Sequence, residues 1–172
     1  LGIYDSIAIG PGLGVDEEKY GLIKHVLRDY NGPVVLDADG LNTMCRFDMD
    51  LAELKNRVSP VILTPHPGEG DRLLDALGEK MLRCSGRLEA VEFLCEKTGR
   101  TVLLKGAGTL VSAPGEKTYI NTTGNPGMAT GGSGDVLTGV IAALAAYGLS
   151  AADAARTGAF MHGLAGDIRS EE

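Results

Sequence analysis

Short apolar runs alternate along the chain with longer segments in which apolar residues recur at helical spacing. Four runs are rich in Val, Ile and Leu, at residues 6–10, 34–38, 60–64 and 101–105. Runs of this kind are typical of parallel strands that are covered on both faces of a sheet. Their alternation with helical segments predicts an α/β fold, with a mostly parallel central sheet and helices on both faces.

The segments between the strands carry recognisable helix ends. Asp16 is suited to cap a first helix, which ends before the Asn-Gly-Pro at residues 31–33. Two short strands around Pro114 and Gly115 predict an antiparallel hairpin at the sheet edge. Further helices are predicted near 50–57, at 67–77 with Gly78 as its end, at 85–98, at 135–147, and from Ser150, paired with Asp153 as a cap, to about 169.

The predicted helix at 135–147 is apolar on nearly all sides. A helix of that kind is normally buried. We therefore expect its N-terminus to lie inside the molecule, where its unpaired amides need hydrogen-bond partners.

The composition is that of an ordinary globular domain. The 172 residues, 44% of them apolar, are enough for one domain. Sixteen Lys and Arg against twenty-three Asp and Glu leave a net charge of −7, with no basic cluster, so nucleic acid is not an expected partner. No apolar run approaches the roughly 20 residues that span a bilayer, so no membrane segment is expected.

The cysteines and the start of the chain bear on the compartment. Cys45, Cys84 and Cys95 lack the spacing of a metal site. We expect reduced thiols and a cytoplasmic protein. Because the chain begins at Leu1 without an initiator methionine, we expect it to be part of a longer protein. A targeting signal upstream of Leu1 is compatible with this expectation.

A glycine- or proline-rich polar motif follows the end of each predicted strand. GPGLG follows the first strand, DADGLN overlaps the end of the second, TPHPGE the third, and KGAGT the fourth. In open α/β sheets, ligands bind outside the carboxyl ends of the strands. We therefore expect the four motifs to converge on one ligand site at this edge of the sheet, here called the carboxyl edge.

The most glycine-rich stretch of the chain directly precedes the helix at 135–147. Gly131, Gly132, Ser133 and Gly134 can turn successive N–H groups toward one point as an anion nest, and the helix adds the positive end of its dipole. Phosphate is the expected ligand. Asp135 would repel an anion, so we interpret it as the base for a hydroxyl that attacks a phosphoryl group. The alternative is a flexible loop with Asp135 as an ordinary N-terminal carboxylate.

Two other glycine motifs are weaker signals. The first comprises Lys105, Gly106, Ala107, Gly108 and Thr109. This KGAGT motif suits close backbone contact with a nucleotide, yet such turns are common without a ligand. GPGLG, which contains Gly12 and Gly14, is equally consistent with a turn that binds nothing. It lacks the spacing of a dinucleotide-binding fingerprint, and no P-loop pattern occurs in the chain.

Polar residues on the second and third motifs are candidate substrate contacts. His66 lies between two prolines, so we expect a stiff backbone and a ring at the carboxyl edge, in contact with substrate. Asn42 is a candidate polar contact, although Asp and Asn at strand ends are also common turn formers. A direct magnesium role for Asp39 or Glu69 is a weaker hypothesis. The other histidines fall within predicted helices and are interpreted as structural: His25 and His162.

The chain resembles the NAD(P)H-hydrate dehydratase family in a series of stretches: GPGLG, DADGLN, LTPHPGE, LLKGAGT, NTTGNPGMATGGSGDVLTGVIAALAAYG and, near the end, HGLAGD. The long block at 121–148 is highly specific, and the resemblance covers essentially the whole chain. It implies a ribokinase-like three-layer sandwich with an edge hairpin. It also implies that residues 1–172 form the central and C-terminal part of one catalytic domain, which continues at both ends.

The resemblance implies repair of hydrated NADH and NADPH. ADP or ATP, with magnesium, phosphorylates the ring hydroxyl of the hydrate, and the phosphate ester then eliminates. Asp135 corresponds to the aspartate that serves as base, and residues 131–134 correspond to the anion hole. A homo-oligomer and a fused or partner NAD(P)H-hydrate epimerase are further expectations.

The resemblance also implies ligand contacts. Besides residues 105–109, nucleotide contacts are expected at Asn125, Gly127, Met128, Ala129, Thr130 and Gly134. Together with Asn42, proposed above, the expected substrate contacts are Gly12, Gly14, His66 and Asp135.

Two other functions fit the same residues. A ribokinase-superfamily kinase of a vitamin-precursor alcohol would use the same base and anion hole, and would release a stable phosphorylated product. A nucleotide-binding module without turnover would bind ADP or ATP and release no phosphate. The motifs GPGLG, DADGLN and TPHPGE favour the dehydratase over these alternatives. Whether ADP or ATP is the phosphoryl donor depends on the space around the terminal phosphate.

Overall fold

A single mixed sheet forms the centre of the molecule. The computed structural model describes residues 2–49 and 51–170, apart from the side chains of residues 52, 53, 83, 84 and 170. The strand order equals the chain order: β1 (Ile7–Ile9), β2 (Val34–Leu36), β3 (Val61–Leu63), β4 (Thr101–Leu104), β5 (Leu110–Ser112) and β6 (Tyr119–Ile120). The first four strands are parallel, and β5 and β6 add an antiparallel edge.

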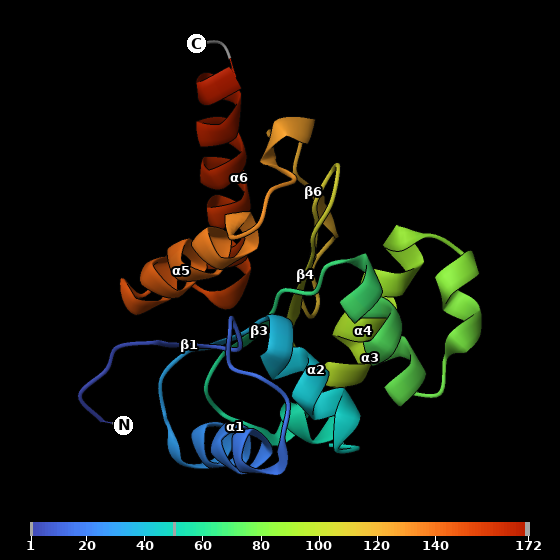
Figure 1. Cartoon of the computed structure of the whole chain (residues 1–172), viewed down its shortest axis with the longest axis vertical. Helices are drawn as coiled ribbons and strands as arrows, with labels where there is room; N and C mark the ends of the chain where they lie inside the picture. Colours follow the sequence, from blue (N-terminus) through green and yellow to red (C-terminus); the bar gives the residue numbers. More distant parts are fainter. Residues whose placement is uncertain (1, 50, 171–172) are drawn as a thin grey trace.

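Helices cover both faces of this sheet (Figure 1). One face carries α1 (Glu17–Asp29), α2 (Ala38–Arg46), α3 (Pro67–Ala76) and α4 (Arg87–Thr98). The other face carries α5 (Ser133–Ala146) and α6 (Ala151–Ser170), whose far half extends beyond the sheet. Three 3₁₀ helices complete the described chain: η1 (Leu51–Asn56), η2 (Lys80–Cys84) and η3 (Pro126–Met128). The predicted three-layer α/β arrangement is confirmed.

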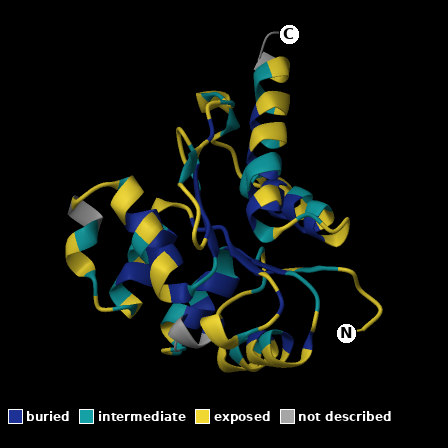
Figure 2. Ribbon diagram, turned by 180° about the vertical axis from the view of Figure 1, so that it is seen from behind, coloured by how far each residue is buried: buried dark blue, intermediate teal, exposed yellow. Residues whose placement is uncertain are grey.

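Alternating side chains of the strands separate the core into two halves. Val34, Leu36 and Leu63 pack against α1 to α4, while Val35 and Ile62 point to the opposite face and pack against α5 and α6. The buried residues therefore follow the sheet between its two helical layers (Figure 2). Strands buried on both faces need nearly continuous apolar sequence, which is the pattern that the chain shows.

The predicted strands and most helix ends are confirmed. The four predicted runs each contain one of β1 to β4, and the hairpin around Pro114 and Gly115 joins β5 to β6. Asp16 caps α1 by accepting a hydrogen bond of 2.9 Å from the amide of Lys19. Ser150 caps α6 in the same way, at 3.1 Å from the amide of Asp153.

Two predictions about residues 34–57 are wrong. The strand predicted at 34–38 ends at Leu36, because Ala38 begins α2, a helix that the sequence did not predict. Asp37 caps this helix, with its carboxylate 2.9 Å from the amide of Ala38. The helix predicted near 50–57 is the short 3₁₀ helix η1, and Asp50 lies outside the described residues.

The expectation that α5 is buried all round, with its N-terminus inside the molecule, is also wrong. Leu137, Ile141 and Ala145 are buried, but Val136 is 59% exposed on the opposite side of the helix. Gly and Ala occupy much of that outer side, so the helix is apolar in sequence without needing burial on every side. Its N-terminus, including Asp135, is exposed to solvent.

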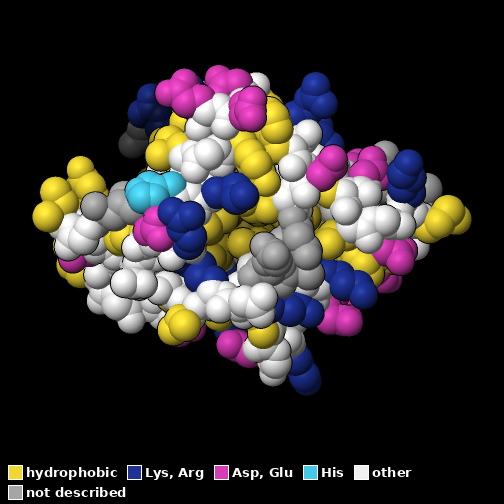
Figure 3. Space-filling model, turned by 90° about the horizontal axis from the view of Figure 1, so that it is seen from below, with side chains coloured by type: hydrophobic (Ala, Val, Ile, Leu, Met, Phe, Trp, Pro, Cys, Tyr) yellow, Lys and Arg dark blue, Asp and Glu magenta, His cyan; other side chains and the backbone are white. Residues whose placement is uncertain are grey.

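The surface and the thiols agree with the sequence. Lys and Arg are interspersed with Asp and Glu on the face seen in Figure 3. No helix in the described part of the chain combines the length and the apolar character needed to cross a membrane. Cys45 and Cys95 are free thiols, as predicted, and the side chain of Cys84 lies outside the described residues.

Truncation of the two faces of α5 should affect stability differently. Ile141→Ala removes a fully buried side chain and should lower the free energy of unfolding by about 2–5 kcal/mol. Val136→Ala on the exposed side should change it by less than about 0.5 kcal/mol. Urea unfolding of both variants measures the difference, and equal losses would contradict the one-sided burial of α5.

Candidate functional site

The four strand-end motifs meet at the carboxyl edge, as the sequence predicts. Backbone hydrogen bonds join each motif to its neighbour: the amide of Asp37 donates to Ile9 O at 3.2 Å, Thr64 to Leu36 O at 3.0 Å, and Lys105 to Pro65 O at 2.8 Å. At Gly10, which has a φ of +133°, a Cβ would lie 1.7 Å from Asp37 O, so only glycine fits there. These contacts hold the first two motifs in direct backbone contact.

The N-terminus of α5 also lies at this edge and has no side-chain cap. Gly132, in the left-handed region with a φ of +86°, turns the chain into the helix. The amides of Gly134 and Asp135 belong to the first turn, where an α-helix offers no acceptor of its own. Gly131 and Gly132 are exposed and Gly134 is half-buried, so these donors are accessible to an anion. The arrangement fits the predicted nest, with Asp135 at its rim.

An ion pair between a buried carboxylate and a partly exposed ammonium lies directly beneath the first turn of α5. Lys105 Nζ donates to Asp37 Oδ1 at 2.6 Å, and the hydroxyl of Thr138 donates to Asp37 Oδ2 at 2.6 Å. A Cβ placed on Gly134 would lie 3.4 Å from Lys105 Nζ. The ammonium group therefore lies next to the candidate anion site, which agrees with the predicted phosphate-side role of Lys105.

The KGAGT loop is positioned from α4. Arg87 donates from its guanidinium to Ala107 O and, at 3.3 Å each, to Leu104 O and Lys105 O. The loop itself turns at Gly106 and Gly108, with φ values of +137° and +61°, and Thr109 Oγ1 closes it with a bond of 3.0 Å to Gly106 O. Arg87 is 18 residues from Lys105 in sequence, and no motif signals its role.

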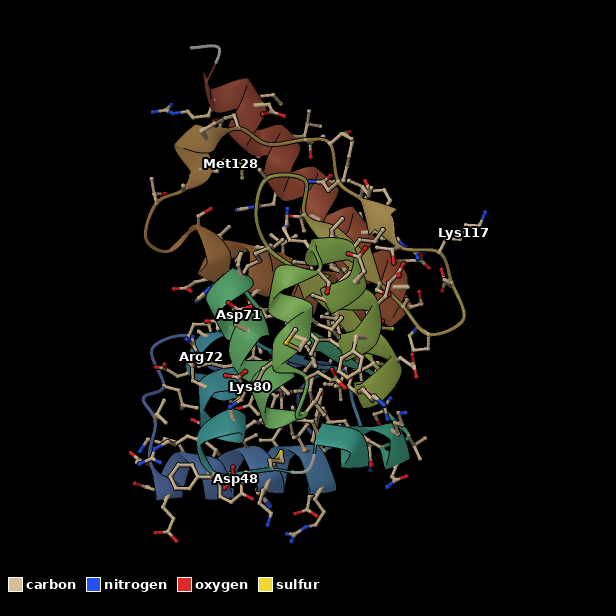
Figure 4. All side chains as sticks on the ribbon, turned by 90° about the vertical axis from the view of Figure 1, so that its right-hand side faces the viewer. Asp48, Asp71, Arg72, Lys80, Lys117 and Met128 are labelled. Carbon is tan, nitrogen blue, oxygen red and sulfur yellow. The ribbon has the colours of Figure 1, made fainter. Side chains whose placement is uncertain are left out.

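The stretch that leads to the nest is tied to the far half of α6. Asn125 caps η3, with Oδ1 3.0 Å from the amide of Gly127, and donates from its side-chain amide to Gly166 O at 2.8 Å. Met128 lies beside α6 at the same end of the molecule (Figure 4). Two hydrogen bonds, from Ala129 N to Pro126 O at 3.1 Å and from Thr130 N to Met128 O at 2.8 Å, continue the turn. These contacts engage both the oxygen and the amide group of the Asn125 side chain. The nucleotide contact that the sequence predicts for Asn125 stays a prediction.

His162, interpreted from the sequence as structural, belongs to this site. Its Nε2 lies 3.4 Å from Ser133 Oγ in the nest. Burial lowers the pKa of His162, and a hydrogen bond with the backbone of Ser133 partly opposes this effect. The HGLAGD stretch was the only sequence signal that could have pointed to this residue. His25, by contrast, pairs with Asp29 on the surface of α1 at 2.6 Å, which agrees with its structural interpretation.

His66 lies at the carboxyl edge, as predicted, and it also caps α3. Its Nδ1 accepts a hydrogen bond of 3.1 Å from the amide of Gly68, which leaves the proton on Nε2. Nε2 lies 3.1 Å from Glu69 Oε1, and Glu69 Oε2 accepts from the amide of His66 at 2.8 Å. Glu69 is buried and lies 3.9 Å from the Lys105 ammonium. The ring is thus fixed in place at the edge while remaining half exposed.

The first two motifs form the neighbouring part of the edge. Asp39 clamps the GPGLG loop by accepting from the amide of Gly14 at 2.9 Å. Asn42 is 3.4 Å from the other oxygen of Asp39 and accepts from Arg72 Nε at 2.8 Å. Gly12, with a φ of +65°, faces open space. The sequence predicted Asn42 and Gly14 as substrate contacts, and both lie on this side of the edge.

A groove of about 610 Å³ opens beside Asn42, between α2, α3 and η2. Charged and small side chains line it, among them Asn42, Cys45, Arg46, Arg72, Asp75 and Lys80. Burial raises the pKa of the Cys45 thiol to about 11, so this thiol is protonated at neutral pH. The groove thus combines basic and acidic groups with a neutral thiol, next to the candidate substrate contacts.

The described residues form no group of three or more His, Cys, Asp or Glu that could hold a metal ion. Asp39 and Glu69, the weaker magnesium candidates, both use their oxygens as acceptors for protein donors. A direct magnesium role for either residue stays a prediction. Magnesium that enters with a nucleotide would be held mainly by its phosphates.

The pKa of His162 leads to a pH prediction. Because its pKa is lower in the folded chain than the ordinary value of about 6.5, the unfolded chain binds more protons as the pH falls through that value. His162 should therefore reduce stability as the pH is lowered from about 7 to about 5. Urea unfolding of His162→Asn should show a smaller loss than the wild-type chain, with His25→Asn as control. Parallel losses in all three chains would contradict this assignment.

The chain is similar in sequence to known proteins of one family. The family model for NAD(P)H-hydrate dehydratase matches residues 1–172. The bifunctional NAD(P)H-hydrate repair enzyme Nnr of Thermofilum pendens is 45% identical over 168 residues, which cover 98% of this chain and 31% of that enzyme.

Solved structures show the same fold. The ADP/ATP-dependent NAD(P)H-hydrate dehydratase of Bacillus subtilis, co-crystallised with ATP and Mg²⁺, superposes with a TM-score of 0.81 at 32% identity, over 98% of this chain and 57% of that one. Ribokinase from Thermotoga maritima, at 20% identity and a TM-score of 0.55 over 84% of this chain and 55% of its own, shares the fold alone, which confirms the ribokinase-like arrangement. The chain thus spans about a third to just over half of the length of these proteins. Its sequence and fold together place the chain in the NAD(P)H-hydrate dehydratase family.

Proposed function

We propose that this chain carries the catalytic centre of an ADP- or ATP-dependent NAD(P)H-hydrate dehydratase, which restores NADH and NADPH from their (6S)-hydrates. The observation that carries the proposal is the uncapped N-terminus of α5 at the carboxyl edge, with Asp135 in its first turn. Such a helix end binds a phosphoryl group, and a carboxylate at its rim can accept a proton from an attacking hydroxyl. The names of the matched relatives support the substrate and the phosphoryl donor.

The reaction proceeds in two steps. The ring hydroxyl of the hydrate attacks the terminal phosphoryl group of the nucleotide, and Asp135 takes the hydroxyl proton. The amides of Gly134 and Asp135, with the ammonium of Lys105, stabilise the charge that develops on the phosphoryl oxygens. The carbon–oxygen bond then breaks, phosphate leaves with its electron pair, and the neighbouring ring carbon loses a proton to water as the double bond forms. Magnesium supplied with the nucleotide would neutralise part of the phosphate charge.

The two sides of the edge would divide the ligands. The KGAGT loop and residues 125–134 flank the nest and would hold the nucleotide. Gly14, Asn42 and His66 lie on the side of the first three strands, where the hydrate would place its ring near Asp135. A dinucleotide extends well beyond its reacting ring, and the groove beside Asn42 would receive part of the remainder.

Partners and compartment follow from the same assignment. The relative in Thermofilum pendens is bifunctional and this chain matches 31% of it, which supports a fused or partner epimerase. We also propose a homo-oligomer in the cytoplasm, where the nucleotide substrates are present.

A kinase of the same superfamily remains the second candidate, because ribokinase shares the fold. It would use the same base and nest, and would differ in releasing a stable phosphate ester. A silent nucleotide-binding module would release neither ester nor phosphate.

Turnover in the full-length protein tests the proposal. Hydrated NADH, magnesium and ADP or ATP should give a nucleotide-dependent rise in the absorbance of the reduced nicotinamide. Asp135→Asn keeps the shape of the side chain and removes the proton acceptor, so the rate should fall by about 10²–10⁴-fold while ADP affinity is retained. No rise with the wild-type protein would reject the dehydratase, and near-normal turnover of the variant would reject Asp135 as the base.

The groove beside Asn42 generates a separate prediction. Arg46→Gln and Lys80→Gln each remove a positive charge from its lining and should raise KM for the hydrate about threefold to tenfold, with kcat unchanged. Lys117→Gln is the matched control, because Lys117 lies on the distant turn of the hairpin (Figure 4). Unchanged KM in both groove variants would place the remainder of the hydrate elsewhere.

A further inference from the structure

A buried carboxylate outside the proposed chemistry connects three elements of the site. Asp37 is 1% exposed and follows β2 directly. It accepts hydrogen bonds from Ala38 N at 2.9 Å, from Lys105 Nζ at 2.6 Å and from Thr138 Oγ1 at 2.6 Å. These donors come from α2, from the residue after β4, and from α5. Asp37 thus links the sheet to the helix that carries Asp135.

Stability alone does not explain this arrangement. Removing a carboxylate and an ammonium from water is costly, and well-packed apolar residues often serve a core as well or better. The backbone is also strained beside Asp37, because Ala38 has a φ of +45°, which side-chain-bearing residues rarely adopt. Strain and buried charge at one point are typical of a site where geometry is functionally constrained.

Asp37 holds the Lys105 ammonium beside the first turn of α5. Lys105 Nζ lies next to Gly134, whose amide belongs to the uncapped first turn of α5. Thr138 is one turn further along the same helix and binds the second oxygen of Asp37. One carboxylate therefore orients both the ammonium and the helix turn whose amides face the same point.

We propose that Asp37 is a positioning residue for phosphoryl transfer. It holds the Lys105 ammonium against the first turn of α5, so that the ammonium and the amides of Gly134 and Asp135 act on the same phosphoryl group. Asp37 exchanges no proton and forms no bond with the substrate; the hydroxyl proton goes to Asp135. This inference rests on the proposed function and adds a residue that neither touches a ligand nor lies in the nest.

The charges give this role a distinct signature. The Asp37 carboxylate partly neutralises Lys105 and repels an incoming phosphate. Asp37→Asn should therefore bind ADP about threefold to tenfold more tightly, because the ammonium loses its nearer counter-ion, at 2.6 Å, and keeps Glu69 at 3.9 Å. The same variant should turn over about 10- to 100-fold more slowly, because a misplaced Lys105 ammonium stabilises the transition state less. A merely structural loss would lower the melting temperature without tightening ADP binding.

A second pair of variants leaves every charge in place. Thr138→Val removes only the hydrogen bond to Asp37 and should lower kcat about tenfold, whereas Thr138→Ser restores the hydroxyl and should keep the wild-type rate. Thr118→Val is the matched control, because Thr118 makes a similar hydrogen bond of 2.9 Å to Glu92 on the surface. This control should leave kcat unchanged.

The experiment measures ADP dissociation constants by calorimetry and steady-state kinetics of the full-length protein and these variants, alone and with Lys105→Met added to Asp37→Asn. The proposal is supported by tighter ADP binding in Asp37→Asn that disappears in the double variant, together with the Thr138 pattern. Unchanged or weaker ADP binding in folded Asp37→Asn overturns it, as does a normal rate in Thr138→Val. If the wild-type protein converts no hydrate, the proposed function fails, and the ADP constants alone decide the role of Asp37.

Discussion

Asp37 is the point on which the geometry of the site depends, because its carboxylate is buried and must find all of its partners inside the molecule. An isolated carboxylate away from water is strongly unfavourable, so the folded chain has to deliver donors to both oxygens at once. Those donors are the ammonium group of Lys105, directly after β4, and the hydroxyl of Thr138, in the second turn of α5. The relative position of sheet and helix is thereby restricted, and the loops of the carboxyl edge are built around a fixed centre.

Different contacts hold the different loops of the carboxyl edge in place. Backbone hydrogen bonds and a glycine that admits no side chain keep the first two motifs in contact. Arg87 holds the KGAGT loop from α4 through three carbonyl oxygens. The stretch before the nest is held from outside, because the side-chain amide of Asn125 donates to Gly166 O on α6. The N-terminus of α5 has no side-chain cap, and that is where an anion can bind.

Local sequence pattern was sufficient for most of the fold and for part of the site. The buried strands are short, apolar and bounded by turn residues, so each could be recognised by itself, and the nest is contiguous in sequence. Helix α2 was missed because its first turn, with Asp, Gly and Asn, has the composition of a turn. The exposed side of α5 was missed because Gly and Ala count as apolar while burying little area. Arg87, Asp37 and His162 act on residues 18, 68 and 29 positions away, and their roles arise only from folding.

The strand order has a consequence for how the chain acquires its structure. Each strand from β2 onward pairs with the strand made just before it, so the sheet can grow in the order of synthesis. The contact between Asp37 and Thr138, by contrast, spans 101 residues. A nascent chain that has completed all six strands still lacks the helix that satisfies Asp37. The anion site therefore cannot form before α5 has been made and packed against the sheet.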